Sequence, residues 1–339
     1  MDLLPSVDQT EIVTSVAELL REQASLDFVR EYVAPGDLSG LWAQLAELGL
    51  FGLGIDPGRG GVGLGLAEEV LTFREIGRAL TPGPLLGTVL AAHLAEEAGD
   101  DALTERIASG AARVALAEPY RDPTAMSGSV VSGTFRVTDL SGADLVLAVT
   151  PDGAAILDAA AVEVRSSPTM DPTTEIGVGV IESGTALCSA ATSRTWWRGC
   201  ALTAALSTGI AEATRDQSVA YAKLREQFGR PIGTFQAVKH RCADMAVRAE
   251  SAYFQTVFAA LAWSSGDPNG THHLASARIV STDASRSNSA DNIQNHGAMG
   301  FSQEVDAHLF AQRSLVLETT LGTERWQLEH IASAQRVEW

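Results

Sequence analysis

The sequence predicts an α+β fold in three consecutive parts. These are an N-terminal helical domain over residues 1–112, a small middle β domain over 113–192 and a C-terminal four-helix bundle over 193–339. In the first and last parts, apolar residues recur at three- and four-residue spacing, as on one face of a helix. Short β-branched runs separated by Gly, Asp and Pro fill the middle part. Long amphipathic segments cover roughly 198–224, 236–264, 270–296 and 303–335, which is typical of a helical bundle.

Local signals place the elements within each part. Asp8 is positioned to cap a helix whose apolar residues include Ile12 and Leu20. The glycine-rich stretch 58–65 follows no strand and precedes no Gly-Lys-Ser/Thr, so we interpret it as an inter-helix loop and not a phosphate-binding loop. Alternating runs such as 145–149 and 161–165 predict a small antiparallel sheet.

Composition excludes several classes of function. The net charge is −18 and no basic stripe is present, which argues against binding to nucleic acid or to an anionic membrane. No apolar run approaches the roughly 20 residues needed to cross a bilayer. The first residues lack a signal-peptide pattern. The three cysteines form no CxxC pair, so we expect a reduced, cytoplasmic protein without a metal site.

Two motifs carry the functional signal. Residues 225–236 read REQFGRPIGTFQ, and residues 294–301 read QNHGAMGF. Both resemble the flavin-adenine contact motifs of acyl-CoA dehydrogenases, and the order of helical, β and helical parts is that of the same family. The resemblance covers nearly the whole chain. It implies FAD as cofactor, an acyl-CoA thioester as substrate and electron-transfer flavoprotein as the usual electron acceptor.

The resemblance assigns one group of residues to the adenine and pyrophosphate of FAD. A pyrophosphate favours a fixed cation and backbone N–H groups nearby. In the family, the arginine of the first motif reaches across a dimer interface to the FAD of the neighbouring subunit. One of the two usual glycines of the second motif is replaced here by alanine. The assigned residues are Arg225, Phe228, Gln236, Gln294, Gly297 and Ala298.

The flavin-ring motifs are degenerate. The family segment Tyr-x-x-Thr-Glu-Pro is matched by residues 114–119, which place Ala117 where a hydroxyl hydrogen-bonds the ring. A second family segment, Trp-Ile-Thr-Asn, is matched by residues 136–139. Thr138 is retained as a cofactor contact, but Arg136 stands at the tryptophan position. The resemblance therefore implies a weakened ring pocket, with a divergent but functional pocket as the alternative.

The catalytic base of the family is missing. The reaction removes the α-proton of the thioester, which needs a carboxylate of tuned pKa beside the α-carbon. Most members place that Glu before a Gly-Thr near the C-terminus, where this sequence has Leu321, followed by Thr323 as a further FAD contact. A minority place it earlier, where this sequence has Gly199. Glu318 and Glu324 lie near Leu321 but are interpreted as solvated charges, so no catalytic residue is predicted.

These features resemble the shorter, degenerate subunits of heteromeric actinobacterial acyl-CoA dehydrogenases. Such subunits form α₂β₂ tetramers that act on steroid side-chain CoA thioesters. The resemblance implies that this chain supplies the adenine and pyrophosphate site while a homologous partner supplies the catalytic Glu. Two alternatives stay open: a self-sufficient homo-oligomeric enzyme with a relocated base, and a non-catalytic binding or scaffold protein of the same fold.

Overall fold

The structure, a computed structural model, describes residues 2–121 and 124–333. The chain divides into two compact units. The helical unit consists of Met1–Arg30, Val70–Thr81 and Cys200–Trp339, and the strand unit consists of Glu31–Glu69 and Pro82–Gly199. The boundaries fall inside helices α4 (Leu66–Ala79) and α7 (Arg194–Leu224). The three-domain division at residues 112 and 192 stays a prediction.

The first helix, α1 (Val7–Gln23), begins with a capping box. The Ser6 hydroxyl accepts a hydrogen bond from the Gln9 backbone N–H, and the Gln9 side chain accepts one from the Ser6 N–H. The prediction that Asp8 caps this helix was therefore wrong. Asp8 lies in the first turn, where its negative charge is favoured by the helix dipole.

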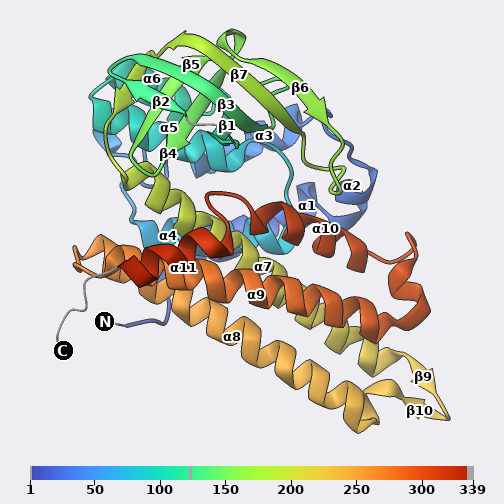
Figure 1. Ribbon diagram of the computed structural model, residues 1–339. Coiled ribbons are helices and arrows are strands. Elements are labelled where there is room, and N and C mark those ends of the chain that lie inside the picture. Colours follow the sequence, from blue (N-terminus) through green and yellow to red (C-terminus); the bar gives the residue numbers. More distant parts are fainter. Residues whose placement is uncertain (1, 122–123, 334–339) are drawn as a thin grey trace. The chain divides into compact units, whose positions relative to one another are not determined.

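Long helices dominate the helical unit, and α7, α8 and α9 lie side by side in it (Figure 1). The buried face of α9 is unusually polar: the Asn288 side-chain amide donates to the carbonyls of Ala211 on α7 and Met245 on α8. The predicted segment 303–335 is two helices, because Leu321 (φ 54°) and Gly322 (φ 94°) adopt left-handed backbone conformations that end helical geometry. The elements of this unit after α1 are α2 (Leu26–Glu31), α8 (Gln236–Ser264), α9 (Gly270–His296), α10 (Ala307–Glu318), α11 (Glu324–Ser333), the hairpin β9 (Glu226–Gln227) and β10 (Arg230–Pro231), and 3₁₀ turns η4 (Ile232–Thr234) and η5 (Gly297–Phe301).

A mixed sheet forms the centre of the strand unit, with strand order β6-β7-β3-β1-β4-β5-β8 and β2 paired to β3. The strands are β1 (Val114–Pro119), β2 (Ala125–Ser127), β3 (Val130–Thr138), β4 (Leu145–Thr150), β5 (Gly153–Asp158), β6 (Glu163–Ser167), β7 (Ile176–Thr185) and β8 (Cys188–Ala190). The sequence predicted an antiparallel sheet, but β1 and β4 run parallel at its centre. A connection through β2 and β3 separates these two strands in the sequence, which leaves enough chain for a parallel pairing.

Helix α5 (Leu85–Ala98) covers the sheet in the strand unit. The other helices of this unit are α3 (Ser39–Glu47) and α6 (Asp101–Ala108), with the 3₁₀ turns η1 (Leu50–Gly52), η2 (Pro57–Arg59) and η3 (Ala159–Ala161). Helix α5 packs directly on β1: the Thr88 hydroxyl accepts a hydrogen bond from the Val114 N–H, and a β-carbon at Gly87 would lie 2.3 Å from the Val114 carbonyl oxygen. Side chains on the other face of the sheet form an interior apolar cluster that includes Ala117, Phe135 and Val137. The predicted α+β class is confirmed.

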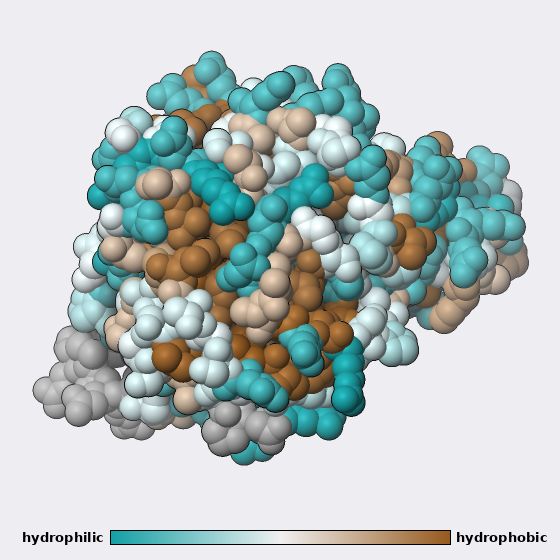
Figure 2. Space-filling model, turned by 90° about the horizontal axis from the view of Figure 1, so that it is seen from above, coloured by the Kyte–Doolittle hydropathy of each residue, from teal (hydrophilic) through white to brown (hydrophobic). Residues whose placement is uncertain are grey.

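Apolar side chains also reach the surface. Figure 2 shows a face on which hydrophobic residues gather in the middle between hydrophilic margins. Among the described residues, no helix combines the length and the apolar character that crossing a bilayer requires. Exposed apolar surface of this kind is typical of contacts with other molecules.

Candidate functional site

The two predicted adenine motifs meet at one end of the helical unit (Figure 1). The Tyr221 ring on α7 stacks on His296 at the end of α9, with ring centroids 4.1 Å apart. Arg241 on α8 donates a hydrogen bond to the Asn295 side-chain oxygen (2.9 Å). These contacts bring residues 225–236 and 294–301 together. His296 is itself buried and hydrogen-bonded to the Asn292 carbonyl, so it is structural.

The hairpin between β9 and β10 presents a strained aromatic residue to solvent. Phe228 has φ 53° and is followed by Gly229 with φ 77°, so both central residues of the turn are left-handed. That conformation suits Gly or Asn but is unfavourable for a bulky side chain. The Phe228 side chain is 91% exposed. It therefore adds strain without burial in the isolated chain, a combination typical of a residue held for contact with something else.

Positive charge surrounds this hairpin, although the chain carries a net charge of −18. Gln236, Gln294 and Ala298 are also exposed there. Gly297 adopts φ 60° and ψ −136°, a backbone region nearly restricted to glycine, and a β-carbon on it would meet no atom within 4 Å. Cations beside an open glycine backbone fit an adenine nucleotide pyrophosphate. The basic residues are Lys223, Arg225, Arg230, Lys239 and Arg241, and the acidic neighbours include Glu226 and Asp291, which forms an ion pair with Arg241.

Leu321, at the position expected for the base, is completely buried in the turn between α10 and α11. Its carbonyl oxygen accepts hydrogen bonds from the Gln327 side chain (3.1 Å) and the Cys200 thiol (3.6 Å). The buried Arg278 guanidinium donates to the carbonyls of Leu317 and Thr320. All these bonds go to the backbone, so the turn keeps its shape independently of the Leu321 side chain. Sequence reasoning did not identify Arg278 and Gln327 as part of this turn, because only the fold brings them there.

Thr323 lies at the start of α11, where its hydroxyl accepts a hydrogen bond from the Trp326 N–H (3.3 Å). The turn that carries it is fixed to Arg278 on α9, sixteen residues before Gln294 on the same helix. At 1.5 Å per residue the two positions are about 24 Å apart along the helix axis. The structure therefore does not bring Thr323 together with Arg225 and Gln294 within one chain.

Thr138 lies on β3 in the strand unit, on the same face as Arg136. The Arg136 guanidinium forms a 2.5 Å ion pair with Glu118, the residue directly opposite on β1. Ala117 belongs to the interior cluster on the other face of the sheet. Strand alternation places Ala117 on the opposite face of the sheet from Thr138, so the two positions that the family resemblance assigns to the flavin ring do not share a face.

Glu69 is the most strongly perturbed acid in the strand unit. It is fully buried between His93 (2.5 Å) and Arg198. Burial alone would raise the pKa of Glu69, but the positive charges of His93 and Arg198 and their hydrogen bonds outweigh it and lower the pKa to about 2. A group that holds its proton so weakly is a poor general base near neutral pH. Gly199, the alternative base position, follows Arg198 directly and has no side chain.

The other buried acids of the described residues are also engaged. Glu75 and Glu212 pair with Arg74 and Arg78 at the contact between α4 and α7. Asp171 accepts hydrogen bonds from Thr173 and Thr174, and Glu118 pairs with Arg136. Glu324 near Leu321 is exposed, and Glu318 is partly exposed. Within residues 2–121 and 124–333, every buried carboxylate is thus neutralised or fixed by donors.

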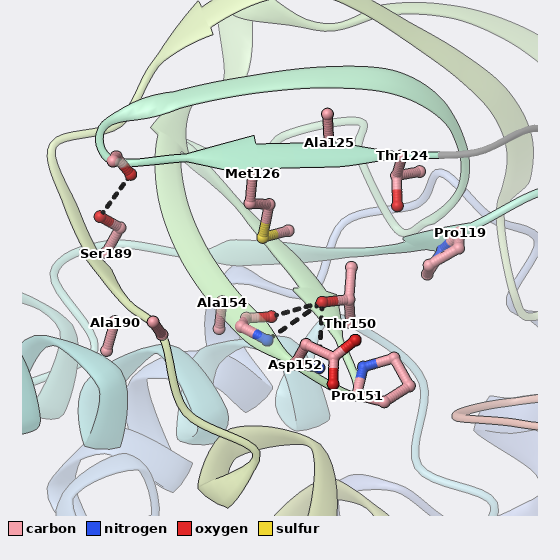
Figure 3. Close-up of a pocket in the computed structure, with 13 residues that line it drawn as sticks. Pro119, Thr124, Ala125, Met126, Thr150, Pro151, Asp152, Ala154, Ser189 and Ala190 are labelled. Carbon is pink, nitrogen blue, oxygen red and sulfur yellow. Dashed lines mark hydrogen bonds between the residues drawn. The ribbon is translucent and has the colours of Figure 1, made fainter.

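A cavity of about 530 Å³ opens in the strand unit (Figure 3). The end of β1, strand β2, the turn between β4 and β5, and β8 enclose it. In that turn the Thr150 hydroxyl accepts hydrogen bonds from the N–H groups of Asp152 and Gly153. No sequence pattern indicated this cavity, since its lining comes from four separate segments. The principal lining side chains are those of Pro119, Thr124, Met126, Thr150, Asp152 and Ser189.

Comparison with known proteins identifies the family. Residues 6–114 match the acyl-CoA dehydrogenase N-terminal domain, and residues 195–335 match the acyl-CoA dehydrogenase C-terminal domain. The chain is 35% identical over 323 residues to acyl-CoA dehydrogenase IpdE2 of Mycobacterium tuberculosis, covering 92% of both proteins. It is 34% identical over 294 residues to acyl-CoA dehydrogenase FadE34 of the same organism, covering 84% of this chain but only 41% of FadE34.

Comparison with solved structures finds the same fold. The chain superposes with a TM-score of 0.83 on the ChsE4–ChsE5 complex of M. tuberculosis, at 22% identity and covering 99% of this chain and 100% of that one. It superposes equally well on the Tcur3481–Tcur3483 steroid acyl-CoA dehydrogenase, with a TM-score of 0.83, 25% identity and 96% of each chain covered. This chain belongs to the acyl-CoA dehydrogenase family, whose cofactor is FAD and whose members are oxidoreductases acting on acyl-CoA thioesters.

Proposed function

We propose that this chain is a subunit of a heteromeric FAD-dependent acyl-CoA dehydrogenase and depends on a homologous partner for the catalytic base. The observation that carries this proposal is the buried, apolar Leu321 at the base position. In addition, every buried carboxylate among the described residues is already held in an ion pair or by hydrogen bonds. Proton abstraction at the α-carbon needs a positioned base of suitable pKa. In this proposal the partner's Glu performs that step.

The exposed end of the helical unit supports a shared cofactor site. Phe228 and the basic residues around it are open to solvent and enclose nothing by themselves. In the proposed assembly, Arg225, Phe228, Gln236, Gln294, Gly297 and Ala298 hold the adenine and pyrophosphate of FAD. The Gln294 end of α9 and the turn that carries Thr323 are about 24 Å apart along the helix axis. This separation fits a site in which one chain binds the adenine of FAD and another chain binds its flavin ring. An α₂β₂ arrangement satisfies this geometry.

The solved relatives support the choice of partner and substrate class. One is the ChsE4–ChsE5 complex, and another is described as a steroid acyl-CoA dehydrogenase. We therefore propose a steroid-derived acyl-CoA as substrate and electron-transfer flavoprotein as electron acceptor. Thr138 and Thr323 are proposed as further cofactor contacts at the edge of the shared site.

The cavity in the strand unit is proposed to hold the pantetheine arm of the substrate. Its volume of about 530 Å³ lies within the usual range of ligand sites. Hydroxyl and backbone groups line it, and Asp152 is the one acidic side chain among the described residues of the lining. A neutral arm with amide groups fits such a lining better than a phosphate does.

Filling this cavity is expected to weaken substrate binding. Met126→Trp replaces a side chain that points from β2 into the cavity (Figure 3) by a larger indole, and the KM for the acyl-CoA should rise at least about 10-fold because the arm loses its space. Steady-state kinetics of the heteromeric complex provide the measurement. Glu163→Trp, on the exposed edge strand β6, serves as the control and should leave KM unchanged.

The proposal is tested by comparing the isolated chain with the complex. Co-expression with the homologous subunit should give acyl-CoA dehydrogenation, and replacing the partner's catalytic Glu by Gln should abolish it. The isolated chain should bind FAD weakly and show no turnover. Turnover by the isolated chain that is lost on mutating one of its own acids would instead establish a self-sufficient enzyme.

Arg225→Ala is expected to lower the affinity of the complex for FAD about 10- to 100-fold, because one charge-assisted contact to the pyrophosphate is lost. Titration of the deflavinated complex with FAD measures this. Arg325→Ala removes an exposed cation whose pairing with Glu329 is local, and should not change FAD binding. If Arg225→Ala leaves both FAD affinity and activity intact, the chain acts as a scaffold and the proposal fails.

A further inference from the structure

We infer that the strand unit of this chain does not receive a flavin ring, because the Glu118–Arg136 ion pair occupies the sheet face beside Thr138 where the ring would lie. This inference deepens the proposed function and rests on it. It concerns which of the two kinds of subunit holds complete flavin sites.

The register fixes which side chains share the face. Glu118 is directly opposite Arg136, and Leu116 is directly opposite Thr138. Residues two apart on a strand point to the same side of a sheet. Arg136 and Thr138 are therefore neighbours on one face, together with Glu118 across the strand pair. Ala117 and Val137 point to the other face, into the interior cluster.

Burial makes the ion pair difficult to displace. The side chain of Glu118 is 5% exposed and that of Arg136 is 16% exposed, and their charged atoms are 2.5 Å apart. A neutral ring entering this space would have to separate the two charges. That separation opposes binding strongly, by at least about 100-fold, since breaking a buried ion pair is highly unfavourable.

The remaining chemistry of the face also does not suit a ring. An isoalloxazine needs an aromatic or apolar surface for stacking, and donors aimed at its ring nitrogens and oxygens. Arg136 brings a charge in place of an aromatic surface, and its guanidinium already donates to Glu118. Ala117 has no donor and faces away. The strand unit therefore keeps Thr138, but the side chains around Thr138 do not form a binding site for the flavin ring.

The test counts flavins and does not rely on activity. The purified heteromeric complex should contain about one FAD per two chains, measured from the absorbance of flavin released by denaturation against protein determined by amino-acid analysis. The double variant Glu118→Leu with Arg136→Trp removes both charges together and supplies an aromatic surface. Its flavin content, with FAD added in excess, should rise toward one per chain.

A matched control removes an ion pair elsewhere in the same unit. Arg59→Ala with Asp101→Ala deletes a largely exposed pair and should leave the flavin count unchanged. The double variant Glu118→Leu with Arg136→Phe, which also removes both charges and supplies a smaller aromatic surface, replaces the first double variant if that variant does not fold, and it should also raise the count. One flavin per chain in the wild-type complex overturns the inference. An unchanged count in a folded variant overturns it as well.

The two proposals can fail separately. If the wild-type complex holds one flavin per chain while the isolated chain stays inactive, the inference about the ring site falls and the subunit function stands. If the isolated chain turns over substrate with its own base, the proposed function falls whatever the flavin count.

Discussion

Replacing Glu69 by Gln is expected to lower the free energy of unfolding by about 3 to 5 kcal/mol, the cost typical of removing one partner from a buried ion pair. Glu69 is fully buried, and its two oxygens are held by His93 and Arg198. Without the negative charge of Glu69, the largely buried Arg198 guanidinium loses the carboxylate that pairs with it here. Urea denaturation of wild type and variant at neutral pH provides the measurement.

The lowered pKa of Glu69 predicts that the free energy of unfolding depends on pH. Its pKa is about 2 in the folded chain against an ordinary value of 4.5, so the unfolded chain binds the proton more readily. The stabilisation by Glu69 is then fully present above pH 4.5 and is lost as the pH falls toward 2. The linked free energy is about 3 kcal/mol. The stability difference between wild type and Glu69→Gln should therefore shrink through this window.

Two controls separate this effect from a general loss of charge. Glu329→Gln removes one partner of an exposed pair with Arg325 and should change stability by less than about 0.5 kcal/mol. Glu69→Gln combined with Arg198→Gln should cost less than the two single changes added together, because both members of this buried ion pair are then removed together. Additive costs in this cycle would contradict the proposed coupling.

Gly209→Ala is expected to destabilise the helical unit by about 2 to 3 kcal/mol through overpacking at a helix contact. A β-carbon at Gly209 on α7 would lie 2.0 Å from the Arg74 carbonyl oxygen on α4. A β-carbon at Gly77 on α4 would likewise lie 2.1 Å from the Leu206 carbonyl oxygen of α7. Both close approaches involve backbone atoms, so the helices must separate to admit a methyl group. The cost outweighs the gain in helix propensity of about 1 kcal/mol.

Gly40→Ala is the matched control for this prediction. Gly40 lies in α3, and a β-carbon there would meet no atom within 4 Å. The substitution should be neutral or stabilise by up to about 1 kcal/mol. Thermal unfolding of the three proteins measures the difference. A Gly209→Ala variant as stable as Gly40→Ala would show that α4 and α7 do not approach as closely as the structure indicates.

Much of the fold could be predicted from local pattern. Helical periodicity identified α7, α8 and α9 almost to their ends, because long amphipathic helices repeat one signal over many turns. The break between α10 and α11 was missed, since it depends on the left-handed backbone of Leu321, a residue that rarely adopts it. The parallel pairing of β1 with β4 was missed because strand partners are not encoded in the strands themselves.

The sequence by itself determined the family resemblance, the two adenine motifs and the absence of a carboxylate at residues 199 and 321, because these depend on residue identity and spacing. Only the tertiary structure decided how the site is divided. It placed the Thr323 turn about 24 Å from Gln294 along the axis of α9. It also buried Ala117 in the interior apolar cluster and paired Glu118 with Arg136. It also joined Glu69 to His93 and Arg198, residues 24 and 129 positions away. The physical reason is that charge pairing and burial depend on distances across the fold, which no local pattern in the sequence specifies.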